Sequence, residues 1–467
     1  MNDTTQYVMK MTKKTNFVSI YSFITSSRIV FIITCILTTT LLIDTSLGRI
    51  SNFITSNAQG SLLISAFTII VITYIVGHNI ILEYTNKKIK DINRKNMLPN
   101  VISKTLRIFQ YSISVFLIVV ILDIFVKSNY HTLMLIIIMT ISYGLSIVTL
   151  AILGKHFFSW FRSRKSYVVL LYALASSVFV LSAIFSLIFV SDIMFKLPNV
   201  IQFHYGNFPY FYSPDSLSSY LYNGYVISSI LSFILMWVAT AMFLYPYSKK
   251  IGKTKYWIII SLPLVYFLSQ FATLLLNLFD PFMQESPVFF GVLLSVIFPI
   301  SKAVGGVLFG IGFWTTARTI NKSNNVRQYL VITAIGFILL FVSDQAVPLI
   351  SAPYPPFGLA SISTVGLSSY LILVGLYYSA ISISNDAKLR KTIRESALRE
   401  SKFLDSIGKA YMEQEIKSKV LGVAKKLKVT MTKETGFSPS LTDVEIEQYL
   451  EEVMTEVKKA KAQSSDK

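Results

Sequence analysis

The sequence predicts an all-α protein, a polytopic bundle of about ten transmembrane helices followed by a short cytoplasmic helical tail. Two features of its composition predict this class. Of its 467 residues, 53% are hydrophobic and only 14% are charged, whereas soluble domains carry about 25% charged residues. Mean hydropathy is +0.58. Apolar runs also recur at lengths near those that cross a bilayer as a helix, about 20 residues.

Ten such runs are bounded by polar or charged clusters, and each is an expected span. Because backbone groups in hydrocarbon must be paired within their own segment, we expect helices, and the period-2 pattern of a membrane barrel is absent. The expected spans are Arg28–Leu47, Ser61–Glu83, Phe109–Val126, His131–Gly154, Tyr167–Ile193, Leu221–Tyr247, Tyr256–Phe279, Pro287–Trp314, Tyr329–Ile350 and Gly358–Ser382.

Loop charge predicts the orientation. The loops after the second, fourth, sixth and eighth spans hold eighteen Lys and Arg residues, whereas the alternate loops hold only Arg49, Lys127 and Lys196. The positive-inside rule therefore predicts a protein of the cytoplasmic membrane with both termini in the cytoplasm. The expected parts are a cytoplasmic segment (1–27), a transmembrane domain (28–383) and a cytoplasmic helical tail (384–467).

The net charge of +19 follows from this topology. Basic loops beside the inner leaflet attract anionic head groups, so the expected partner is the lipid bilayer and not nucleic acid. The single cysteine, Cys35, excludes an internal disulfide. The four histidines show no metal-ligand spacing, and no nucleotide-binding or zinc-hydrolase motif is present. We therefore expect no catalytic residue, no cofactor and no metal, and a protein that is not an enzyme.

Lys302 is the most unusual residue of the expected spans. It lies in "FPISKAVGG", about 12 residues from the inner end of its run, which places it near the bilayer midplane. An unpaired charge there costs at least about 2.5–3.5 kcal/mol, so Lys302 requires a partner. Asp344 on the next span is the best candidate, and we predict a contact between the two side chains. Asp123 and Asp192, which lie nearer the outer ends of their spans, are the alternatives.

The residues around Lys302 fit a specialised helix. Pro299 removes one helix hydrogen bond and can open the helix locally. Gly305 and Gly306 follow, and Gly306 with Gly310 has the spacing of closely packed membrane helices. Kinked helices with a midplane charge form substrate and ion sites in transporters. A sealed structural ion pair would need the same residues, and the sequence leaves both interpretations open.

Acidic residues collect near the expected outer ends of the spans. Asp123, Asp192, Asp280 and Glu285 are candidates for an acidic outer vestibule that attracts cations, and Asp44 lies at a similar level. The alternative is that all of them are solvated helix ends.

The tail carries apolar stripes at helical spacing. Ile416, Val420, Val423 and Leu427 step by 4, 3 and 4, as a coiled-coil seam does, and Leu404, Ile407 and Tyr411 form a second fragment out of phase. After "ETGFSPS" breaks the helix, Thr442 and Glu445 have capping-box spacing. The residues Ile446, Leu450, Val453 and Val457 then repeat the 4, 3, 4 stripe. The stripes predict helices that associate with themselves, with a partner protein or with the lipid surface.

Three motifs in the last quarter of the chain carry a resemblance. These are "PPFG" before the final apolar helix, "SND" and "LRK" after it, and "SIG.A..EQEI" in the tail. With them the chain resembles uncharacterised archaeal multi-pass membrane proteins that have a sensor-like junction to a short cytoplasmic helical tail. The resemblance implies no catalytic activity.

These observations predict a sensor-like or receptor-like signal module that couples a membrane domain to the tail. A secondary transporter or ion-coupled permease with a midplane Lys302 site, binding a small ligand or ion, is the main alternative. A structural subunit of a membrane complex is the third.

Overall fold

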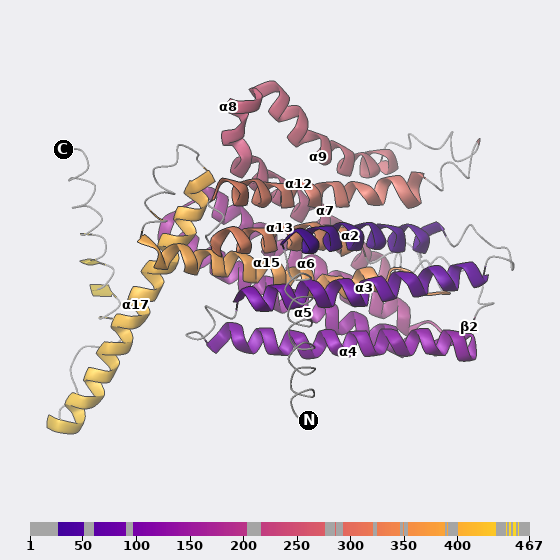
Figure 1. The fold of residues 1–467 in the computed structure, drawn as a ribbon, viewed down its shortest axis with the longest axis horizontal. Coiled ribbons are helices and arrows are strands. Elements are labelled where there is room, and N and C mark those ends of the chain that lie inside the picture. Colours follow the sequence, from indigo (N-terminus) through magenta and orange to yellow (C-terminus); the bar gives the residue numbers. More distant parts are fainter. Residues whose placement is uncertain are drawn as a thin grey trace, which may run out of the picture.

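The computed structural model describes residues 27–50, 60–89, 97–202, 216–275, 293–320, 325–345, 354–387 and 400–435, with a few single positions between and after them. Its helices lie side by side as an elongated bundle (Figure 1). The tail helix α17 (Glu400–Thr435) crosses one end, which we name the tail end. A short strand pair lies at the other end, which we name the β end.

The first half of the bundle consists of long apolar helices. They are α2 (Ser27–Ile50), α3 (Gly60–Ile89), α4 (Met97–Lys127), α5 (Thr132–Arg164), α6 (Tyr167–Phe195) and α7 (Leu217–Leu244). Strand β1 (Asn129–His131) pairs antiparallel with β2 (Val200–Gln202), which ties the α4–α5 connection to the segment after α6. These strands were not predicted from the sequence, because three residues are too few to show an alternating pattern.

The second half begins with a short turn, η3 (Tyr245–Tyr247), and a short helix, α8 (Ser248–Ile251). The helix α9 (Lys253–Leu275), a π-helical turn η4 (Leu293–Ile297) and three further helices follow. These are α12 (Phe298–Thr319), α13 (Asn325–Ser343) and α15 (Leu359–Asn385).

Helix α15 is the centre of the bundle. The apolar stretch of α15 that is long enough to span a membrane is buried inside the protein over its whole length, and most of the corresponding stretch of α13 is buried too. Two glycines allow α13 and α15 to touch. A Cβ on Gly375 would lie 2.2 Å from Thr333 Oγ1, and one on Gly336 would lie 2.9 Å from the backbone nitrogen of Ile372. Small residues at such contacts let membrane helices pack closely.

Nine of the helices in the described chain are long and apolar enough to cross a membrane, which is the pattern of an all-α multi-pass membrane protein. The predicted seventh span corresponds to α9, which is not among the nine. It contains Pro263 and packs on α7, where Trp237 Nε1 donates to the Ile260 carbonyl at 2.7 Å. The predicted count of ten and the predicted orientation therefore stay predictions.

Candidate functional site: a buried ion pair and a docked tail helix

Lys302 and Asp344 contact each other inside the bundle, as the sequence predicts. Lys302 Nζ forms an ion pair with Asp344 Oδ2 and also donates to the Asp344 carbonyl oxygen at 2.7 Å. Both residues are buried, with relative exposures of 7% and 0%. Asp344 follows directly after the last residue of α13, Ser343. Its carbonyl accepts from the lysine at this helix end, where carbonyls lack intrahelical donors.

Helix α7 completes the surroundings of the ammonium group. Lys302 Nζ donates to Ser229 Oγ at 3.0 Å and lies 5.8 Å from the centre of the Tyr225 ring. A cation over an aromatic face gains electrostatic attraction in addition to its hydrogen bonds. Lys302, on α12, therefore contacts side chains of α7 and the residue that follows the end of α13.

A neighbouring layer of hydrogen bonds extends to α2. Gln345 Nε2 donates to the Pro299 carbonyl at 3.3 Å, and Arg49 Nη2 donates to Gln345 Oε1 at 3.5 Å. Pro299, the second residue of α12, follows the π-helical turn η4. The candidate residue Pro299 thus takes part in the contact network through its carbonyl.

Three buried polar atoms at or beside the pair have no hydrogen-bond partner among the described residues. They are Asp344 Oδ1, the Tyr143 hydroxyl on α5 and the Ser186 hydroxyl on α6. Tyr143 interacts electrostatically with Asp344 and lies beside Ser186, although the two hydroxyls do not meet hydrogen-bond geometry. An unsatisfied buried polar atom is costly, and bound water or an ion can account for such atoms. This group has the polar atoms to hold a small hydrogen-bonding species.

The candidate glycines are points of close helix contact. A Cβ on Gly305 would lie 2.3 Å from the Phe233 ring of α7, and a Cβ on Gly306 would lie 2.6 Å from Phe341 Cβ of α13. A Cβ on Gly310 would lie 2.8 Å from the Ala334 carbonyl oxygen of α13. The predicted close approach at Gly306 and Gly310 is therefore between α12 and α13.

Helix α12 continues to Thr319, five residues past Trp314, where the predicted span ends. Lys302 therefore lies 17 residues from the tail end of α12, about 26 Å at 1.5 Å per residue. Residues 286–292, on the other side of Lys302, lie outside the described ranges. The predicted midplane depth of the pair stays a prediction.

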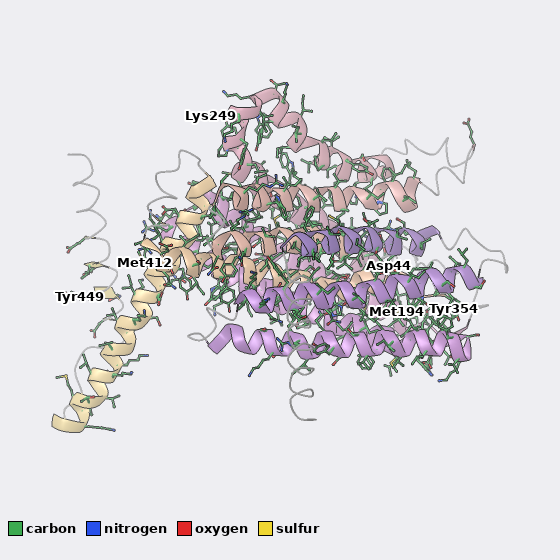
Figure 2. The ribbon with its side chains drawn as sticks, in the orientation of Figure 1. Asp44, Met194, Lys249, Tyr354, Met412 and Tyr449 are labelled. Atoms are coloured by element: carbon green, nitrogen blue, oxygen red, sulfur yellow. The ribbon has the colours of Figure 1, made fainter. Side chains whose placement is uncertain are left out.

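Asp44 lies on α2 (Figure 2). It is fully buried, so it is not a solvated helix end, which was one of the two interpretations that the sequence left open. Its carboxylate accepts from the backbone N–H groups of Gly358 and Ser361, both at 2.9 Å, and from Ser361 Oγ at 2.8 Å. A carboxylate at a helix N-terminus satisfies free N–H groups and the helix dipole. Asp44 therefore caps α15 from a neighbouring helix.

The acids of the predicted outer vestibule do not share one environment. Asp123 binds Lys127 at 2.9 Å, and Asp192 binds Lys196 at 2.6 Å, each one turn along its own helix. Glu285 is exposed, and Asp280 lies outside the described residues. Local lysines offset the charge of the first two acids, so the vestibule stays a prediction.

The start of α17 is docked on the bundle. Phe403, Leu404, Ile407 and Ala410 are buried. The Phe403 ring lies 5.6 Å from Tyr172 of α6, 5.4 Å from Phe243 of α7 and 6.2 Å from Phe313 of α12.

Two further contacts hold α17 at the tail end. A Cβ on Gly408 would lie 2.4 Å from Ile383 Cγ2, so α17 crosses the end of α15 at this glycine. Glu413 pairs with Arg164 of α5. Beyond these contacts α17 runs obliquely away from the bundle; Figure 2 labels Met412 near the point of departure.

No cluster of three or more His, Cys, Asp or Glu side chains suited to a metal ion occurs among the residues that the structure describes. Comparison with protein-family models, curated proteins and solved structures finds no match.

Proposed function

We propose that the protein is a membrane signal module. A change around the Lys302–Asp344 pair is passed through the bundle to the helix α17, and a cytoplasmic partner reads the position of that helix. The docking of Phe403 carries this proposal. A single tail side chain packs against rings from three membrane helices, so a shift of those helices alters its binding site.

Two helices connect the proposed input and output. Helix α12 carries Lys302 and Phe313, which are 11 residues or about 16 Å apart. Helix α7 carries Ser229 at the ion pair and Phe243 at the tail. Packed helices transmit small shifts because tightly packed interfaces change between discrete arrangements instead of deforming continuously. A rearrangement at the pair therefore has a direct physical route to Phe403.

Distances between spin labels test the proposal. In a Cys35→Ser background, labels go on Arg162→Cys near the tail end of α5 and on Thr432→Cys near the end of α17; both native side chains are exposed. Removing both charges with Lys302→Met and Asp344→Leu should shift the distance distribution or add a second population.

The matched control removes the exposed ion pair of α4 with Lys127→Met and Asp123→Leu. It should leave the distances unchanged. If the protein with the native Lys302–Asp344 pair, the double variant and the control all give the same distance distribution, the coupling is refuted and a purely structural ion pair is favoured.

One observation favours a second candidate, ion-coupled transport. Asp344 Oδ1 and the Tyr143 hydroxyl are buried without hydrogen-bond partners, and such atoms suit a transiently bound ion or proton. Purified protein in vesicles that contain a pH-sensitive dye would reveal a proton flux that Asp344→Leu abolishes. Equal fluxes in protein-free vesicles would count against this candidate.

A further inference from the structure

The second half of α17 presents an apolar stripe that the described chain leaves uncovered. Ile416, Val420, Val423 and Leu427 have relative exposures of 45%, 39%, 57% and 58%. These four residues, the α17 stripe, step by 4, 3 and 4 and so lie on one face of the helix. The first half of the same helix has its apolar residues buried on the bundle. The stripe therefore differs from the docked half in having no apolar cover.

The chain encodes a matching segment a few residues further on. Ile446, Leu450, Val453 and Val457 step by the same 4, 3 and 4. Because this spacing reads the same in both directions, two such stripes can face each other in antiparallel orientation without any mismatch. Ile416 then opposes Val457, Val420 opposes Val453, Val423 opposes Leu450, and Leu427 opposes Ile446.

The charges of the two segments are complementary. Residues 416–433 contain six lysines and no acidic residue, and residues 443–456 contain six acidic residues and no Lys or Arg. In the antiparallel register above, Lys419 lies opposite Glu456 beside the apolar seam. Two copies of the basic segment would instead repel each other when brought together.

The connection has the length and composition of a helix–helix turn. Helix α17 ends at Thr435, Gly436 follows directly, and Pro439 comes three residues later. A glycine and then a proline are typical after a helix end. The capping box begins at Thr442, which leaves six residues for the turn, and connections between packed helices have about 2–8 residues.

We propose that residues 442–457 form a helix that folds back on the α17 stripe of the same chain as an antiparallel hairpin. The short turn gives the segment a high effective concentration at the stripe, which favours the same chain over a second copy. The hairpin stands whether or not the bundle transmits a signal. A partner protein that uses the stripe must first displace this segment.

Disulfide formation tests the register. The full chain with Cys35→Ser is reconstituted in nanodiscs of zwitterionic lipid and carries Val423→Cys with Leu450→Cys. Mild oxidation should link the pair within one chain, detected by mobility on non-reducing gels and by mass spectrometry of the linked peptides. The matched control is Gly422→Cys with Leu450→Cys, because a side chain at Gly422 meets nothing within 4 Å and lies off the stripe.

The hairpin predicts linkage of the 423–450 pair at least five times faster than of the control pair. Charge gives a second readout: Lys419→Glu should slow linkage, and adding Glu456→Lys should restore it. Linkage between chains, slowing on dilution, would overturn the hairpin in favour of self-association. Equal rates for both cysteine pairs would also overturn it, and protection of the stripe only in anionic nanodiscs would then identify lipid as the occupant.

Discussion

Replacing Lys302 with Met should destabilise the fold strongly. The substitution keeps the length of the side chain but removes the donor to Asp344 Oδ2 and to the Asp344 carbonyl. Asp344 Oδ1 already lacks a partner, so the carboxylate would have no counter-charge in a buried site. Losing one partner of a buried pair costs about 3–5 kcal/mol.

The two single variants should not be equivalent. After Asp344→Leu, Lys302 keeps two acceptors, the backbone carbonyl of residue 344 and Ser229 Oγ. The loss should then be nearer the cost of a hydrogen bond to a charged group, about 1.5–3 kcal/mol. The double variant removes both charges and should lie within about 1 kcal/mol of the original protein, because apolar replacement of a buried pair is often neutral.

Reversible unfolding in mixed micelles measures these free energies and gives the coupling between the two residues. We expect a coupling of about 2 kcal/mol or more, since the effects of substitutions at residues in direct contact are not additive. Lys127→Met, which breaks an exposed pair, should cost about 1 kcal/mol or less. Additive effects at Lys302 and Asp344, within about 0.5 kcal/mol, would refute the buried pair.

Two further predictions concern α15. Asp44→Ala should lower the free energy of unfolding by about 2 kcal/mol or more, because it leaves buried N–H groups at the start of α15 without an acceptor. Asp44→Asn keeps an acceptor oxygen and should lose less. If the alanine variant loses no more than the asparagine variant, Asp44 is not the cap of α15. Gly375→Ala should lower the free energy of unfolding by about 1–3 kcal/mol, because the added methyl group overpacks against Thr333. Gly144→Ala should be tolerated, because a Cβ there meets nothing within 4 Å. Equal unfolding midpoints for the two variants would contradict the close contact at Gly375.

Much of the membrane domain could be predicted from the sequence, because lipid imposes strict demands on length and polarity. Charges are rare in such segments, so Lys302 and Asp344 stood out and their contact could be inferred. The inner end of the eighth span was placed too early, at Trp314, because Arg318 and the threonines near it suggested a loop, whereas α12 continues to Thr319.

Other parts of the site left no readable signal. Ser229 is one of many serines in apolar helices, where its hydroxyl can bond to its own backbone, so its contact with Lys302 depends on helix packing alone. The role of Asp44 depends on which helix end lies beside α2, and no local pattern encodes that. Leu404 and Ile407 were recognised as apolar stripe residues, but only the fold separates this docked fragment from the exposed α17 stripe.

The proposed signal module requires that the Lys302–Asp344 pair and the docked start of α17 are coupled through α7 and α12. The decisive measurement is hydrogen exchange of residues 400–411, with the full protein in nanodiscs and the Lys302→Met, Asp344→Leu double variant beside it. We expect these amides to exchange at least about fivefold faster in the double variant, with exchange in α3 unchanged. Equal exchange of residues 400–411 in both proteins would show that the pair and the tail helix are independent.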